Sequence, residues 1–515
     1  MYNNLIAYGY FPKELPDGFS TGSLLKVLNK DRANLIRASH RAERKLRSDY
    51  KICHYNLARP YSIRRRLGIV NPIPFAALCA TLDDNKADIF SQISSYDGNG
   101  GKISESADRI RAVVRSSKTE SDIISKLEFR SEGKCLLQCD ISRFYGSIYT
   151  HSIPWAMNGK IQSKRSRNPF ANVGNEIDYW IRSGQDGQTI GIPIGPDTSH
   201  IISEIVLSYF DKKINESSYK MYRFVDDIEI STRTGAEAEE AMHYVQTVLA
   251  DLELELNRHK TKILQAPQSI GEMWASELRM FNFRDNNSNN QMYDIVEFVN
   301  KAIRLFAGKD AEYAIKYSIS RLSNVNIKID NWRLYLNILI SSMNMDPTCI
   351  ENSSLEILKY TRMTYPLDKE RMSKLYSDLM VSNLTSGNHS AVAWIVCFCM
   401  QLNLTIKNYA CDAMLECSDS VLYILMIDAM EKGLTETTLE YDCIQNIITS
   451  SGLAGSEWLL AYQYSYFADA NYDLVNKLLD TSEIFREMFE NRVSFYQSNN
   501  YISTNRENKY IENYS

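Results

Sequence analysis

Two adjacent acidic residues, Asp226 and Asp227, interrupt the segment "YRFVDDIEIS", which otherwise has the apolar pattern of a β-strand. Side-by-side carboxylates repel each other, and neither is a typical core residue. A second apolar segment, "LLQCDISRFYGSIY", carries a third acid, Asp140, 86 positions before Asp226. A strand ending on an acid, beside a hairpin with two acids at its tip, can hold two divalent metals about 4 Å apart for in-line phosphoryl transfer.

The oxygen donors of these acids indicate which metal the site would take. Hard cations that keep some water and bind phosphates prefer carboxylates, so we expect Mg²⁺, with Mn²⁺ as the alternative. The ten cysteines form no CxxC pair and have no His partners at zinc spacing, which fits reduced thiols better than a disulfide framework or a sulfur-bound metal. Taken alone, an Asp-Asp pair is more typical of a solvated turn, so the metal hypothesis depends on its companions.

The elements around these acids predict a mixed fold. Strand-like and helical segments alternate over residues 134–265, which indicates an antiparallel sheet backed by helices. We expect an exposed Gly-rich loop at residues 94–106 and a linker at 284–291. Amphipathic helical segments fill residues 292–515, which favours an α-solenoid, with a plain helical bundle as the alternative.

Charge is distributed unevenly along the 515 residues. The net charge is −5, but residues 1–134 carry 23 Lys and Arg against 15 Asp and Glu, whereas residues 301–515 carry 19 against 26. Phosphate contacts are therefore expected in the N-terminal third. The longest apolar stretch, "AVAWIVCFCMQL", is too short to span a bilayer, and the first residues lack the basic start of a signal peptide. We expect a cytoplasmic protein without membrane contact.

Five segments resemble, in order, the motifs of reverse transcriptases. "FVDD" resembles the central motif of their palm, "DISRFYGSIYTHSIPWA" their first catalytic motif, and "RRRLGIVNPIPF" (64–75) their fingers hairpin. "GIPIGPDTSHIISEIVL" (191–207) resembles the motif that lines the template and nucleotide site, and "LELNRHKTKI" (254–263) the motif with a basic residue near the triphosphate.

This resemblance implies an α+β fold with reverse-transcriptase-like fingers and palm, the palm an antiparallel sheet backed by helices, followed by an all-α C-terminal domain of HEAT-like helical repeats. The implied domains are residues 1–134 (N-terminal helices and fingers), 135–285 (palm with the catalytic carboxylates) and 286–515 (C-terminal helices).

The resemblance also assigns catalytic roles. It makes Asp140 and Asp226 the metal ligands, with Asp227 as an adjacent, weaker one. Lys260 matches the basic residue that donates a proton to the pyrophosphate leaving group. A lysine at a helix end remains the alternative interpretation for Lys260.

The resemblance to reverse transcriptases also assigns residues to nucleotide binding. Arg64 and Arg65 match residues that clamp the triphosphate, although an exposed basic turn stays open as an alternative. Tyr145 matches the aromatic residue that lies under the sugar and excludes a ribose 2′-hydroxyl, and the alternative is that it packs behind the strand. Of the two neighbouring aromatic residues, we expect Phe144 to be the one that packs inward. Gly195 belongs to the template-lining motif. Ile194 stands where many members of the family have Gln, which puts ordinary templated copying in doubt.

Within the family, "GYFPKELP", "IYTHSIPWA" and "GIPIGPDTS" are most similar to the abortive-infection and defence-associated bacterial enzymes. That similarity implies a phage-defence DNA polymerase that uses dNTPs, without a template and primed by its own tyrosine, so that the DNA product is covalently attached. It also implies a homo-oligomer, a trimer or a hexamer. Tyr2, Tyr8 and Tyr10, on an N-terminus that we expect to be mobile, and the cluster at 462–467 are candidate primers.

Three alternatives stay open at this point. The chain could be a conventional RNA-templated reverse transcriptase that works with a non-coding RNA. It could be a related palm enzyme that makes RNA. It could also be a helical-repeat interaction protein with a non-catalytic palm, although crowded acids are costly unless a metal binds them.

Overall fold

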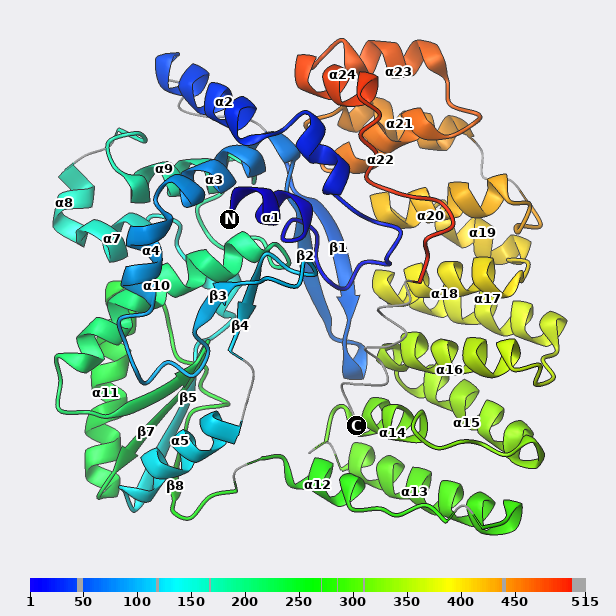
Figure 1. Ribbon diagram of the computed structural model, residues 1–515, viewed down its shortest axis with the longest axis horizontal. Coiled ribbons are helices and arrows are strands. Elements are labelled where there is room, and N and C mark those ends of the chain that lie inside the picture. The colour runs from blue at the N-terminus through cyan, green and yellow to red at the C-terminus, as the bar shows by residue number, and fades with distance from the viewer. Residues whose placement is uncertain are drawn as a thin grey trace.

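The computed structural model describes residues 1–43, 50–116, 120–165, 168–269, 271–284, 286–308, 311–437 and 441–502. It is a mixed helix and sheet structure in two halves (Figure 1). The N-terminal half, blue to green in the figure, contains every strand of the described chain. The C-terminal half, green to red, is a stack of helices.

A four-stranded antiparallel sheet forms the centre of the first half. Its strands are β5 (Cys135–Asp140), β6 (Met221–Phe224), β7 (Asp227–Thr232) and β8 (Lys262–Gln265), in the spatial order β6-β7-β5-β8. The central strand β5 pairs with both β7 and β8 in antiparallel register. This confirms the antiparallel sheet that the sequence predicts for this part of the chain.

Helices cover both faces of this sheet. Ile228 and Ile230 of β7 are buried, whereas Glu229 points to the opposite face because side chains alternate along a strand. On that face Glu229 binds Arg130 of α5 (Glu120–Ser131) through two hydrogen bonds of 2.7 and 2.8 Å. The helices of the palm are α6 (Phe144–Ser147), α7 (Ser152–Asn158), α8 (Lys160–Arg165), α9 (Val173–Ser183), α10 (Asp197–Asn215) and α11 (Gly235–Asp251).

The N-terminal elements pack on the palm and do not form a mobile arm. They are α1 (Tyr2–Ala7), η1 (Gly22–Lys26), α2 (Lys30–Ala42), the hairpin β1 (Cys53–Ala58) and β2 (Arg64–Ile69) joined by η2 (Pro60–Ser62), α3 (Pro72–Asp84) and α4 (Lys86–Ile93). Tyr2 and Tyr10 are buried, and the Tyr2 hydroxyl donates to the carbonyl of Leu28 at 2.9 Å. The expectation of a mobile N-terminus is wrong because its apolar side chains complete the core.

The Gly-rich segment at 94–106 also differs from the exposed loop that we expected. Its residues 98–100 lie along β6: the Arg223 N–H donates to the Gly98 carbonyl, and the Gly100 N–H donates to the Arg223 carbonyl, both at 2.8 Å. A Cβ on Gly98 would lie 2.2 Å from the Met221 carbonyl oxygen, so the glycine allows the backbones to approach. The short hairpin β3 (Ile103–Glu105) and β4 (Val113–Arg115) follows this segment.

The C-terminal half consists of helices that pack mostly on their neighbours in sequence. They are α12 (Met273–Arg279), α13 (Ser288–Ala307), α14 (Ala314–Leu322), η3 (Ile329–Asn331), α15 (Trp332–Met345), η4 (Pro347–Cys349), α16 (Ile350–Arg362), α17 (Lys369–Thr385), α18 (His389–Leu402), α19 (Asn408–Met414), α20 (Ser420–Glu431), α21 (Tyr441–Ser451), α22 (Trp458–Gln463), η5 (Tyr464–Tyr466), α23 (Tyr472–Leu479) and α24 (Glu483–Glu490). Helix α13 begins inside the segment 284–291 that we expected to be a linker, because Asn287 caps it by accepting from the Asn290 N–H.

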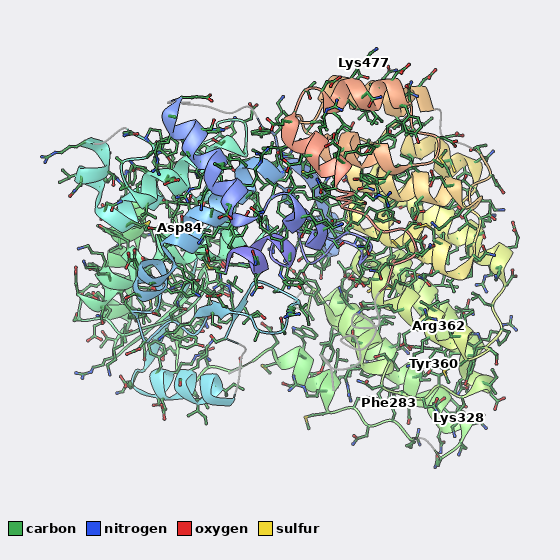
Figure 2. All side chains as sticks on the ribbon, turned by 45° about the horizontal axis from the view of Figure 1, so that its top comes forward. Asp84, Phe283, Lys328, Tyr360, Arg362 and Lys477 are labelled. Carbon is green, nitrogen blue, oxygen red and sulfur yellow. The ribbon has the colours of Figure 1, made fainter. Side chains whose placement is uncertain are left out.

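Aromatic side chains fill the space between these helices. Figure 2 shows Phe283 and Tyr360 in the lower part of the helical half. Tyr360 is buried, its ring lies 5.2 Å from that of Trp332, and its hydroxyl accepts a hydrogen bond from the Ile327 N–H. Across the described residues, the helices lack the combined length and apolarity that crossing a bilayer requires.

The two halves are joined along the β1–β2 hairpin and along the chain ends. The Ala58 N–H donates to Ser390 of α18, and Tyr61 at the hairpin tip stacks on Phe306 of α13 at 5.1 Å. The Ser20 N–H donates to the Phe495 carbonyl at 3.0 Å, so the N-terminal segment pairs with the segment after α24. The hairpin is therefore fixed to the helical stack at several points.

Candidate active site

Strand register brings the three acids to one edge of the palm sheet. β5 and β7 pair so that Asp140 lies directly opposite Asp227. Val225 and Asp226 form the two-residue turn that joins β6 to β7, so Asp226 directly precedes the first residue of β7, Asp227. The Asp226 carbonyl accepts from the Ile141 N–H at 3.3 Å. Carboxylates that are 86 positions apart in the chain thus become neighbours.

The turn itself has an unusual backbone. Its first residue, Val225, has a φ of 57°, a left-handed conformation that is rare for a β-branched side chain. A positive φ at this position matches the right-handed twist of the flanking strands. The turn therefore needs support from its surroundings to present Asp226.

Arg223 of β6 supplies this support. Its side chain is 0% exposed, and Nη1 donates to the Val225 carbonyl at 3.1 Å. The other guanidinium atoms bind Asp211 and Glu204 of α10, with Nη2 at 2.7 Å from Asp211 and 2.9 Å from Glu204. Because both acids are buried, Arg223 neutralises them and in turn is held by them.

Asn257 and Lys260 contact Asp140 from the segment before β8. Lys260 Nζ donates to Asp140 Oδ2 at 2.8 Å, and Asn257 Nδ2 donates to Asp140 Oδ1 at 2.9 Å. The Asn257 N–H also donates to the Asp140 carbonyl at 2.7 Å. Asp140 is 5% exposed, whereas Lys260 is largely exposed and reaches in from the surface.

Crowding of charge alters the proton affinities at this edge. Burial, together with the charges of Asp227 and Asp140, raises the pKa of Asp226. Burial disfavours the charged form of Lys260, but its hydrogen bond with Asp140 and the charges of all three aspartates raise its pKa overall. The three acids therefore give this edge an excess of negative charge, and Lys260 offsets part of it.

A divalent cation fits these donors chemically. Three carboxylates at one edge are hard oxygen ligands, and a cation would relieve the repulsion that raises the pKa of Asp226. In the present arrangement Asp140 is turned toward Lys260 and Asn257, and within the described residues no group of three or more His, Cys, Asp or Glu side chains is arranged to hold an ion. Metal binding would therefore require Asp140 to give up its hydrogen bond with Lys260 and bind the cation instead.

Tyr145 follows Asp140 by five positions in the chain and lies in α6. Phe144 is the buried aromatic residue of this pair, and Tyr145 is half-buried. The Tyr145 hydroxyl lies 2.9 Å from Nδ1 of His200 in α10, and Arg115 of β4 donates to it at 3.4 Å. Burial and the nearby charges of Arg115 and Arg111 lower the pKa of His200 to about 3.

Gly195 occupies a position where only glycine fits. Its φ is 131°, and a Cβ would lie 2.5 Å from Cγ of Pro12. Its carbonyl accepts from Arg111, which also forms an ion pair with Asp197 at the start of α10. The preceding Ile194 carbonyl accepts from the Gly68 N–H of β2 at 2.9 Å, which ties this loop to the fingers hairpin.

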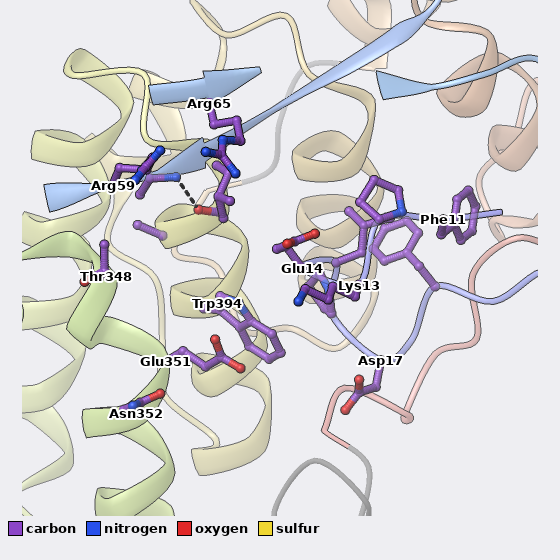
Figure 3. Close-up of a pocket in the computed structure, with 18 of the residues that line it drawn as sticks. Phe11, Lys13, Glu14, Asp17, Arg59, Arg65, Thr348, Glu351, Asn352 and Trp394 are labelled. Atoms are coloured by element: carbon purple, nitrogen blue, oxygen red, sulfur yellow. Dashed lines mark hydrogen bonds between the residues drawn. The ribbon is translucent and has the colours of Figure 1, made fainter. Parts of the chain in front are cut away.

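Arg64 and Arg65 lie on exposed positions of β2, away from the carboxylates. A cleft of about 770 Å³ lies between the N-terminal segment, the β1–β2 hairpin and helices α16 and α18. Figure 3 shows Arg59 and Arg65 on the strand side of this cleft and Glu351 and Trp394 on the helical side. Arg64 points instead toward Gly387, whose added Cβ would meet its guanidinium.

The structure thus joins Asp140, Asp226, Asp227 and Lys260 in one site, with Tyr145 close by in sequence to Asp140. Sequence reasoning missed the residues that support this site: Arg115, His200, Glu204, Asp211, Arg223 and Asn257. Two of them had a signal, because Arg223 stands inside the apolar approach to the acids and Asn257 stands three positions before Lys260. His200 and Glu204 lie inside the quoted segment 191–207 without a pattern that indicates their contacts, and Arg115 and Asp211 lie outside the quoted segments.

A family model matches the part of the chain that carries these acids. Residues 104–284 match the family described as reverse transcriptase (RNA-dependent DNA polymerase), and this range includes the three acids, Tyr145 and Lys260. No curated protein sequence matches the chain. Among solved structures, the chain is similar to apo telomerase from Candida tropicalis, with 11% identity and a TM-score of 0.32 over 78% of this chain and 75% of that one. It is also similar to telomerase from Candida albicans in complex with a TWJ fragment of telomeric RNA, with 12% identity and a TM-score of 0.27 over 67% and 66%.

Acids paired across antiparallel strands, a lysine bound to one of them and the family match over the same residues lead to one conclusion. The chain contains a reverse-transcriptase domain at residues 104–284 and is a nucleotidyltransferase.

Proposed function

We propose that the protein is a DNA polymerase that joins dNTPs by two-metal nucleotidyl transfer at Asp140, Asp226 and Asp227. The observation that carries this proposal is the register of β5 and β7, which sets Asp140 opposite Asp227 and beside Asp226. Mg²⁺, or Mn²⁺ in its place, would be held by these carboxylates and would activate the attacking hydroxyl and neutralise charge on the phosphates.

The other residues have roles that follow from their positions. Lys260 holds a proton on Nζ beside Asp140, where it can be given to the departing pyrophosphate. Tyr145 restricts the space at the sugar, and Gly195 lets the loop before α10 pass close to Pro12. Arg64 and Arg65 are proposed to bind the triphosphate, and this role requires β2 to come closer to the acids, because the cleft that contains Arg65 is not lined by them.

A synthesis assay tests the proposal directly. Purified protein with dNTPs and Mg²⁺ should make DNA, and the double variant Asp226→Asn/Asp227→Asn should make none. Glu239→Gln, on the exposed face of α11, removes a charge remote from the site and should leave synthesis intact. Wild-type protein that makes no DNA under any mixture of dNTPs, metals, primers and templates would contradict the proposal.

We also propose that this synthesis serves phage defence and starts on a tyrosine of the chain. The motif resemblance supports both ideas, and the structure narrows the choice of tyrosine. Tyr2, Tyr10, Tyr462 and Tyr464 are buried, whereas Tyr8 and Tyr313 line the cleft that contains Arg65. Tyr8 and Tyr313 are therefore the accessible candidates among the residues considered, and either hydroxyl would have to reach the metal site to act as the primer.

Mass spectrometry after nuclease digestion would identify a covalent nucleotide and its tyrosine. Tyr8→Phe or Tyr313→Phe should abolish the adduct, and Tyr472→Phe, 67% exposed on the remote helix α23, should not. In infected cells, the Asp226→Asn/Asp227→Asn variant should lose any protection that the wild type gives. DNA synthesis without an adduct would remove self-priming and favour a conventional templated enzyme.

We further propose that the C-terminal helices form HEAT-like repeats that assemble a homo-oligomer, and that 1–134, 135–285 and 286–515 are the domains. Successive packing of α13 on α14, α15 on α16 and α17 on α18 supports the repeats. Light scattering on the purified chain measures the assembly, and a monomer at all concentrations would contradict it.

A further inference from the structure

The hydroxyl of Tyr145 is held from two sides by elements other than its own helix. Its oxygen lies 2.9 Å from His200 Nδ1, and the two rings meet edge to face with centroids 6.0 Å apart. Arg115 Nη2 reaches the same oxygen at 3.4 Å. At the other end of the residue, the Tyr145 carbonyl accepts from the Ile192 N–H at 2.9 Å.

The directions of these hydrogen bonds follow from the chemistry of the partners. A guanidinium can only donate, so the Tyr145 oxygen accepts from Arg115. We assign the phenol proton to the bond with His200, which makes Nδ1 the acceptor and places the proton of the neutral imidazole on Nε2. The depressed pKa of His200, about 3, keeps the ring in this neutral form over the physiological range.

Arg115 is itself fixed. Its Nη1 donates to Glu204 Oε1 at 2.7 Å and to the Gly101 carbonyl at 2.9 Å. Glu204 is buried and binds Arg223, the residue that supports the turn of Asp226. The phenol is thus connected to a charged network inside the palm and not to mobile surface groups.

We propose that His200 and Arg115 are specificity-determining residues, which set the preference for deoxyribose over ribose by holding the Tyr145 ring in place. A steric filter works only if the blocking group cannot move aside, and a ring held at its hydroxyl cannot give way to a 2′-hydroxyl. The inference rests on the proposed function, in which Tyr145 lies beneath the sugar of the incoming nucleotide.

Single-nucleotide incorporation with dNTPs and NTPs tests the inference. The variants are Tyr145→Phe, which removes one oxygen, His200→Phe, which keeps a ring but no acceptor, and His200→Gln, which restores an acceptor. Each Phe variant should lower the dNTP-to-NTP ratio of kcat/KM by roughly tenfold, the value of one lost hydrogen bond. The change should appear mainly as a lower KM for the NTP.

Two further comparisons separate positioning from general damage. The double variant Tyr145→Phe/His200→Phe should lose no more selectivity than either single variant, because both remove the same bond. His200→Gln should recover most of the ratio. His243→Phe, at an exposed position of α11, is the matched control and should keep the wild-type ratio.

The outcomes distinguish the inference about sugar specificity from the proposal that the protein is a polymerase. A folded His200→Phe or Tyr145→Phe variant with the wild-type ratio overturns the inference and leaves the polymerase proposal standing. If His200→Phe does not fold, Tyr145→Phe alone decides. A wild-type protein that incorporates neither dNTPs nor NTPs overturns the proposed function, and this inference with it.

Discussion

Arg223 Nη1 donates a hydrogen bond of 3.1 Å to the carbonyl of Val225, two residues further along the same hairpin. Val225 has the left-handed backbone of the turn, and Asp226 follows it. A strained residue persists only where its surroundings hold it, so the buried guanidinium is part of how the carboxylate is presented.

Replacement of Arg223 should therefore affect both stability and catalysis. Arg223→Met leaves Asp211 buried without its counter-charge and Glu204 with Arg115 alone, and we expect the free energy of unfolding to fall by roughly 3–5 kcal/mol. Denaturant unfolding of the variant measures this loss. Residual DNA synthesis, normalised to folded protein, should also fall because the turn loses its support.

The double variant Arg223→Met/Asp211→Asn serves as the control. It removes the two opposite charges together, leaves Glu204 paired with Arg115, and should recover a large part of the stability, because unpaired charge is the main cost. Equal destabilisation of the single and double variants would show that packing, and not charge, makes Arg223 important.

Asp226→Asn should have opposite effects on stability and on activity. Burial and the charges of Asp227 and Asp140 raise the pKa of Asp226, which means that its ionised form costs free energy in the folded state. A neutral Asn removes this cost, so without metal we expect the variant to be more stable than the wild type. DNA synthesis should be lost.

Thermal unfolding with and without Mg²⁺ measures the second half of this prediction. Wild-type protein should gain stability with Mg²⁺, since a ligand that binds only the folded state raises the melting temperature. The Asp226→Asn variant should gain much less. Identical Mg²⁺ effects in both proteins would place metal binding elsewhere and favour a non-catalytic palm.

The palm could be predicted from the sequence because its signals are local. Apolar segments ending on Asp140 and Asp226 define strands, and antiparallel pairing then brings the acids together. The supporting contacts could not be predicted. Arg223 and Glu204 meet through tertiary packing, and a buried ion pair of this kind has no signature in sequence spacing.

Two expectations from the sequence, the exposed loop at 94–106 and the mobile N-terminus, were wrong for physical reasons. Glycines at 98–100 indicate a loop, but here they let the backbone pass close to β6, where a Cβ on Gly100 would lie 2.1 Å from the Tyr222 hydroxyl. Aromatic residues at the N-terminus indicate nothing about order by themselves. Tyr10 becomes buried because Phe75 and Phe495, from distant parts of the chain, surround it.

Lys260→Gln should separate metal binding from proton transfer. The substitution removes the ammonium that occupies Asp140 at 2.8 Å, so Mg²⁺ no longer competes with a like charge and should half-saturate at a severalfold lower concentration. The maximal rate should nevertheless fall by roughly 100-fold, because the proton donor is gone.

Steady-state rates over a range of Mg²⁺ concentrations test both effects. Lys262→Gln, two residues away on the exposed strand β8, changes the same charge and should alter neither value. A Lys260→Gln enzyme with the wild-type maximal rate would show that Lys260 only screens Asp140.

Gly195→Ala should disrupt the loop that leads into α10. At a φ of 131° an L side chain is strained, and the new Cβ would lie 2.5 Å from Cγ of Pro12 in the N-terminal segment. Strain and overpacking together should lower the free energy of unfolding by roughly 2–4 kcal/mol.

Gly235→Ala is the matched control, since nothing lies within 4 Å of its Cβ and the first position of α11 accepts alanine, so stability should stay the same or rise. Because Pro12 and Arg111 both contact Gly195, the displaced loop should also lower DNA synthesis, and a Gly195→Ala protein as stable and active as Gly235→Ala would contradict the close approach seen here.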